Sequence, residues 1–124
     1  MERRVALNDL LTFSRPLDSI SADLHRFPWD SESELAEMTV EVAIDVLGRA
    51  LRGDLTPVDI EEWANLIESR EDIGFPYDDE SLLMDLVFDL ANPALNGPIT
   101  DEKLRNWVSQ LEAASHSQEG FVDK

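Results

Sequence analysis

Residues 53–68 read GDLTPVDIEEWANLIE, and residues 97–112 read GPITDEKLRNWVSQLE. The second segment begins 44 residues after the first and aligns with it without a gap: Gly, Thr, Trp and the last Glu are identical, and apolar residues match at four further positions. Periods of this length are typical of paired-helix repeats such as HEAT and armadillo proteins, although such arrays usually need about three copies. The pattern predicts two copies of one helix pair.

Each copy carries a start signal for a helix at the shared threonine. Thr56 and Thr100 are favourable N-cap residues, and Thr56 is followed at once by proline, which suits the first helical position. A more apolar helix precedes each threonine, over residues 39–52 and 79–91, and Gly53 is placed to cap the first of them. Helices that are apolar on most sides are usually buried. We therefore expect these two helices at the centre and the helices after the threonines on the surface.

Alternation of apolar and polar residues over strand lengths is almost absent, so the sequence predicts an all-α fold. We expect a compact bundle of two duplicated antiparallel helix pairs, with N-terminal helices over residues 5–13 and 16–27 closing one side. Trp63 and Trp107 share one repeat position and are expected to be equivalent core residues. The expected boundaries are 39–68 for the first repeat, 83–112 for the second and 115–124 for a loosely ordered tail, all within a single domain, 1–124.

The composition points to a cationic partner. The chain has 124 residues, with 27 acidic and 10 basic side chains and a net charge of -17. Such a field repels nucleic acid and anionic lipid and steers cationic molecules toward the protein. The absence of cysteine excludes disulfides and thiolate chemistry. Because no signal peptide and no apolar run of membrane-spanning length is evident, we expect a cytoplasmic protein.

No motif in the chain indicates catalysis. His25 and His116 lie far apart in sequence and outside any metal-binding histidine motif, and the acidic run 78–80 lacks the alternating ligands and glycine of a calcium loop. Phosphate-binding glycine loops and Gly-x-Ser-x-Gly elbows are also absent. The sequence predicts a protein that is not an enzyme and uses no metal or cofactor, and a hydrolytic or metal-dependent enzyme stays a third alternative.

The negative charge is concentrated in one part of the chain. Residues 27–80 hold 16 acidic side chains and three arginines, a net charge of -13, and the densest parts are two predicted loops that also contain large aromatic residues. Aromatic residues among charges are typical of an interface centre with a charged rim. The alternative is a solvated acidic face whose aromatic residues fold inward as loop anchors. The candidate partner-binding residues are Trp29, Asp30, Glu32, Glu34, Glu71, Asp72, Phe75, Tyr77, Asp78 and Asp79.

Parts of the chain resemble known proteins. The segments 63–75, 90–93 and 97–100 resemble an uncharacterised family of small bacterial proteins. In size, acidity and expected helix content the chain is similar to immunity proteins, which neutralise nuclease toxins of bacteriocin and contact-dependent inhibition systems. The helical immunity proteins of DNase bacteriocins contact the toxin through a Tyr-Tyr-Pro element and following acids, to which residues 75–79, Phe-Pro-Tyr-Asp-Asp, are loosely similar. This resemblance implies toxin contacts by Tyr77, Asp78 and Asp79.

The resulting functional hypothesis is a cytoplasmic inhibitor of a cationic nuclease toxin. It would associate by electrostatic steering and cover the toxin's phosphate-binding cleft with carboxylates in place of phosphates. The alternative is a helical-repeat adaptor or regulatory module that binds a basic protein or peptide.

Overall fold

The computed structural model describes residues 2–27 and 33–122, with side chains through residue 115. Helices account for most of these residues, as the sequence predicts, and two very short strands pair in parallel. The elements are α1 (Arg3–Thr12), α2 (Leu17–Leu24), β1 (Ala36–Glu37), α3 (Val40–Leu51), α4 (Pro57–Glu68), β2 (Ile73–Gly74), the 3-10 helix η1 (Tyr77–Asp79), α5 (Glu80–Ala91), α6 (Pro93–Asn96) and α7 (Asp101–Val122).

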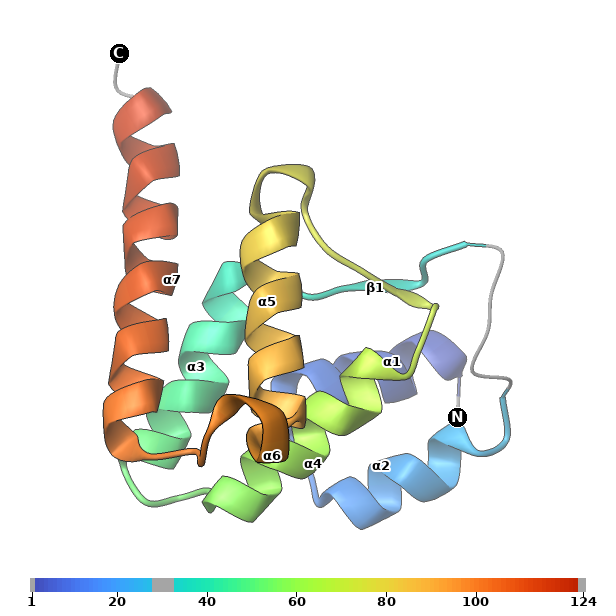
Figure 1. The fold of residues 1–124 in the computed structure, drawn as a ribbon. Helices are drawn as coiled ribbons and strands as arrows, with labels where there is room; N and C mark the ends of the chain where they lie inside the picture. The colour runs from blue at the N-terminus through green and yellow to red at the C-terminus, as the bar shows by residue number, and fades with distance from the viewer. Residues whose placement is uncertain (1, 28–32, 123–124) are drawn as a thin grey trace.

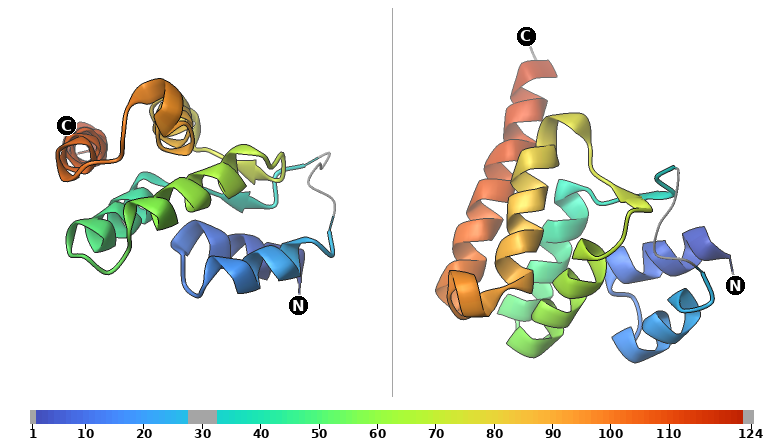
Figure 2. Two further views of the ribbon diagram at one scale, coloured as in Figure 1. Left: turned by 60° about the horizontal axis from the view of Figure 1, so that its bottom comes forward. Right: turned by 45° about the vertical axis from the view of Figure 1, so that its right-hand side comes forward.

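The helices form three layers (Figures 1 and 2). Helices α1 and α2 pack together in the first layer, α3 and α4 occupy the middle layer, and α5 and α7 lie in the third. Helix α3 lies mainly against α7, and α4 lies mainly against α5. The middle layer is therefore covered on both sides, which places the hydrophobic core around it.

The helix boundaries follow from local chemistry. The hydroxyl of Thr56 accepts a hydrogen bond from the backbone N–H of Asp59, whose carboxylate accepts one from the backbone of Thr56, so the two residues form a reciprocal capping box. The hydroxyl of Thr100 accepts a hydrogen bond from the N–H of Lys103 at the start of α7. Gly53, with φ of 88°, follows the end of α3 in the left-handed region that favours glycine. These predicted caps are confirmed.

The main helix pairings differ from the expected ones. The sequence predicts principal pairs of α3 with α4 and of α5 with α7, whereas α3 packs mainly against α7 and α4 packs mainly against α5. Helix α4 was expected on the surface, yet it also contacts α1, α2 and α3. Its apolar face is buried because it lies between two layers.

The two tryptophans occupy different environments, which corrects the expectation of equivalence. Trp63 is fully buried, and its indole N–H donates to the carbonyl oxygen of Leu10 at 2.9 Å. Trp107 is partly buried, and its indole N–H donates to the carboxylate of Asp89 at 2.6 Å. The difference arises because α4 has helices on both sides, whereas α7 covers the outside of α3 (Figure 2).

Three further features depart from the sequence prediction. The parallel strands β1 and β2 lie in two segments that the sequence predicts to be loops, residues 29–37 and 69–78. Helix α7 continues to Val122, past the expected end near residue 115. Helix α5 was expected to be largely buried, but Met84 and Phe88 are 52% and 49% exposed.

Within the described residues, no helix is both long and apolar enough to cross a membrane.

Candidate protein-binding groove

The β1–β2 pair brings the two acidic segments of the chain together. Ala36 lies opposite Ile73, and Glu37 lies opposite Gly74. The backbone N–H of Leu35 donates to the carbonyl of Asp72 at 2.8 Å, which extends the pairing beyond the two-residue strands. Residues near 34 are thereby held beside residues 71–75, although they are far apart in the sequence.

A buried ion-pair cluster next to β2 holds the paired strands in position. The carboxylate of Asp72 is fully buried and accepts hydrogen bonds at 2.9 Å from Arg3 and from both Nε and a terminal nitrogen of Arg70. Burial alone raises the pKa of Asp72, but hydrogen bonds from the two arginines outweigh this effect, and the pKa lies below its ordinary value. Arg4 donates to the carbonyl of Leu35 at 2.9 Å. Both arginines at the start of α1 therefore hold the strand segments in place.

The position of Gly74 permits a close approach of Glu34. A Cβ atom added to Gly74 would overlap the carboxylate of Glu34, whose side chain lies across β2. Gly74 is buried and has an ordinary strand conformation, so the requirement is for space rather than for an unusual backbone angle. The glycine thus helps to set where the Glu34 carboxylate lies.

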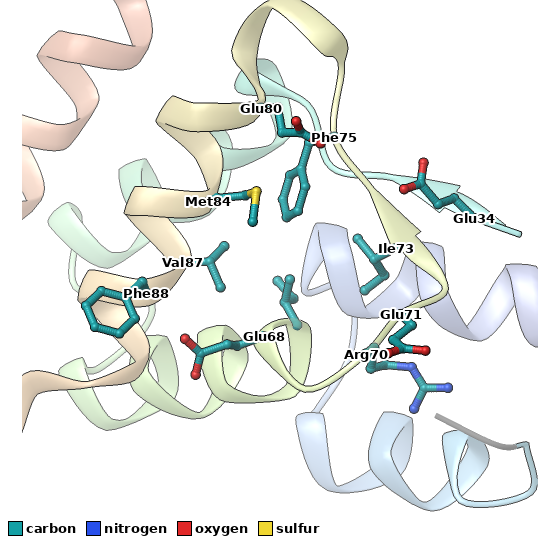
Figure 3. Close-up of a pocket in the computed structure, with 11 residues that line it drawn as sticks. Glu34, Glu68, Arg70, Glu71, Ile73, Phe75, Glu80, Met84, Val87 and Phe88 are labelled. Carbon is teal, nitrogen blue, oxygen red and sulfur yellow. The ribbon is translucent and has the colours of Figure 1, made fainter. Parts of the chain in front are cut away.

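An open groove of about 430 Å³ lies between the end of α4, the strand β2 and α5 (Figure 3). Apolar side chains from all three elements form its interior, and carboxylates surround them. The apolar residues are Ile67, Ile73, Phe75, Met84, Val87 and Phe88, and the carboxylates are Glu34, Glu68, Glu71 and Glu80. Arg70 also lines the groove, and its guanidinium is bound to Asp72. The surface therefore combines apolar area with excess negative charge.

Three of the candidate residues line this groove, and two exposed ones lie in η1, which precedes α5. Glu34, Glu71 and Phe75 line it. Tyr77 is 94% exposed in η1, and Asp78 is exposed next to it. The phenol of Tyr77 is thus accessible to a partner, whereas Phe75 is half-buried and packs against the core. Phe75 therefore folds inward as a loop anchor, whereas Tyr77 faces solvent.

The remaining candidates are placed differently. Asp72 was expected at a partner-binding surface, but its carboxylate is enclosed and neutralised by two arginines. Asp79 was also expected at the surface, but it is only 8% exposed at the junction of η1 and α5, where its N–H donates to the carbonyl of Pro76. Trp29, Asp30 and Glu32 lie outside the described residues.

The sequence analysis named three of the eleven lining residues and missed the other eight, which are Ile67, Glu68, Arg70, Ile73, Glu80, Met84, Val87 and Phe88. Glu80, Met84 and Phe88 follow one another at steps of four on α5, which places them on one helix face. That spacing was visible in the sequence. However, the apolar residues of α5 surround the helix axis and leave only a narrow polar stripe, a pattern that favours a buried helix.

Two other acidic positions on apolar helices have local partners. Asp45 lies 3.4 Å from Arg49, a pairing that the four-residue spacing within one helix predicts. Arg49 also donates to the carbonyls of Thr12 and Phe13 at the end of α1. Asp89 binds Lys103 at 3.0 Å as well as Trp107. The contacts of Arg49 join the first and middle layers, and the contacts of Asp89 join α5 to α7 within the third layer.

Among the residues that the structure describes, no group of three or more His, Asp or Glu side chains is arranged to hold a metal ion. No protein-family model matches the chain, and searches of curated proteins and of solved structures return no match.

Proposed function

We propose that the chain is a protein-binding inhibitor, an immunity protein that neutralises a cationic nuclease toxin in the bacterial cytoplasm. The observation that supports it is the groove between α4, β2 and α5, where exposed apolar side chains are surrounded by Glu34, Glu68, Glu71 and Glu80. Interfaces combine an apolar centre with a polar rim in this way. The chain's net charge of -17 selects a positively charged partner.

The proposed mechanism has two stages. The acidic surface first accelerates encounter with the basic cleft of the toxin, an effect that weakens as salt shortens the reach of the field. The groove and the exposed ring of Tyr77 then hold the complex together. Carboxylates at the rim occupy the places where the toxin would bind substrate phosphates, so substrate is excluded.

We also propose that the 44-residue correspondence is a duplication in which the copies exchange partners. The reciprocal packing of α3 against α7 and of α4 against α5 supports this interpretation, because each pair combines the first helix of one copy with the second helix of the other. Equivalent capping by Thr56 and Thr100 also supports it. The different surroundings of the two tryptophans then follow from the N-terminal helices, which cover only one copy.

The groove also favours a second candidate function, an adaptor that binds a basic peptide. A volume of about 430 Å³ is in the range of small-ligand pockets, roughly 300–1,000 Å³, and suits a single segment of a partner. The two functions differ in outcome: an immunity protein protects cells from a toxin, whereas an adaptor links its partner to another process without inhibition.

A protection assay tests the proposal. The partner to test is any basic C-terminal domain that a neighbouring open reading frame encodes, produced in cells with or without this chain. Protection and a salt-sensitive association rate are expected. The variant Glu71→Lys/Asp78→Lys should abolish protection, because both residues are exposed at the proposed surface. Tyr77→Ala should mainly speed dissociation, with a loss of about 2 kcal/mol for a hot-spot aromatic residue.

The matched control is Glu62→Lys/Glu112→Lys, which makes the same charge change at exposed positions that do not line the groove. The control should retain protection, with circular dichroism showing intact helices in both variants. Equal protection by the two double variants would place the interface elsewhere, and binding without protection would favour the adaptor.

A further inference from the structure

The exposed part of α5 is unusual for a helix that packs on a core. Met84 and Phe88 lie one turn apart and are each about half exposed, while Val87 between them is buried. Across the groove, Phe75 and Ile73 face the same space from the strand side (Figure 3). Contiguous apolar area on a soluble protein commonly marks a binding site.

The carboxylates lie on several sides of this apolar surface. Figure 3 shows Glu80 and Glu68 near the two ends of the groove and Glu34 and Glu71 beside the strand. Among the described lining residues the only cation is Arg70, and Asp72 holds its guanidinium at 2.9 Å. A side chain that enters the groove is thus surrounded by negative charge, and its neighbours along the partner chain meet carboxylates in both directions.

Building on the proposed function, we infer that the groove receives one large apolar side chain of the partner, flanked on both sides by lysine or arginine. The apolar side chain contacts Phe75, Met84 and Phe88, and the flanking cations contact the surrounding glutamates. Charge complementarity selects this occupant. A second copy of the chain carries the same net charge of -17 and is repelled, and nucleic acid is repelled for the same reason.

Methionine methyl NMR with synthetic peptides provides a direct test. The probes are capped Lys-Lys-Phe-Lys-Lys, the same peptide with Ser in place of Phe, and Glu-Glu-Phe-Glu-Glu. The methyl group of Met84 lies in the groove, whereas Met38 is fully buried in the core and serves as an internal control. The Lys-Phe peptide should shift the Met84 signal in a saturable manner and leave Met38 unchanged. The Ser and Glu peptides should shift it much less.

Two substitutions distinguish peptide binding in the groove from nonspecific binding to exposed apolar residues. Phe88→Gln should weaken binding of the Lys-Phe peptide by about tenfold or more, since it removes part of an apolar contact without changing charge. Leu95→Gln is the matched control: Leu95 is 76% exposed but does not line the groove, so this variant should bind as the wild type does.

Equal binding of the Phe and Ser peptides, or an unchanged affinity of Phe88→Gln, would overturn the inference. These outcomes leave the proposed function testable by the protection assay, in which a toxin could bind the acidic surface without an apolar anchor. Conversely, peptide binding with the expected selectivity, together with a failure to protect cells, would uphold the inference and reject the immunity function.

Discussion

Replacing Asp72 with asparagine should destabilise the fold while leaving the outer surface almost unchanged. Asparagine has nearly the same shape but removes the negative charge that neutralises Arg3 and Arg70. Removing one partner of a buried ion pair costs about 3–5 kcal/mol. The side chains of Arg3 and Arg70 are 19% and 9% exposed, so some water reaches them, and we expect the lower end, about 3 kcal/mol.

Thermal denaturation followed by circular dichroism measures this loss. For a chain of 124 residues, about 3 kcal/mol corresponds to a fall in Tm of roughly 12 °C. The adjacent variant Glu71→Gln is the control, because Glu71 is exposed and its neutralisation should change stability by less than about 0.5 kcal/mol. Equal melting temperatures for Asp72→Asn and the wild type would refute a structural role for the cluster.

The carboxylate of Asp72 also makes a predictable contribution to the stability of the fold in acid. Its pKa is lower in the folded chain than its ordinary value of 3.8, so the unfolded state binds a proton at a higher pH than the folded state does. The contribution is complete above pH 3.8 and is lost as pH falls through the folded pKa. The stability difference between wild type and Asp72→Asn, measured by urea denaturation, should therefore be constant from neutral pH to about pH 5 and shrink only in stronger acid.

Four further substitutions test the packing, the groove and a helix cap. Trp63→Ala should cost about 4 kcal/mol, and Trp107→Ala clearly less, because only the first is fully buried; similar losses in urea denaturation would contradict the assigned environments. Gly74→Ala should displace Glu34 and weaken binding of the Lys-Phe peptide, with only a small fall in Tm because the clash is with a flexible side chain. An unchanged affinity would show that Glu34 is not needed for binding. Thr56→Ala should lower stability by about 1 kcal/mol through loss of the capping box, measured by thermal melting.

Local features of the fold could be predicted because local chemistry determines them. The Thr56 cap, the end of α3 at Gly53 and the Asp45–Arg49 pair each depend on residues close together in the sequence. The choice of helix partner could not be predicted in the same way. The apolar stripe of α7 is compatible with α3 or with α5, and only the assembled layers decide between them.

The candidate site was partly predictable for a similar reason. Charge density and aromatic content identified the segment around Glu71 and Tyr77, because composition is visible without a fold. Asp72 looked like its acidic neighbours, and its burial depends on Arg3, which lies 69 residues away. Phe88 looked like a core residue, and its exposure depends on where α5 lies in the outer layer.

The packing of α3 against α7 and of α4 against α5 has a consequence for assembly. The buried faces of α3 and α7 cover each other, as do those of α4 and α5, so each half alone would expose apolar surface that the other half covers. Cleavage near the exposed residue Asp78 would separate α3 and α4 from α5 and α7. The two fragments should then regain structure only when mixed, with a dependence on concentration. In the intact chain the segment around Asp78 joins the two halves, so their association is intramolecular. Because α3 pairs with α7, which is far away in the sequence, folding should be slower than for a bundle of local helical hairpins.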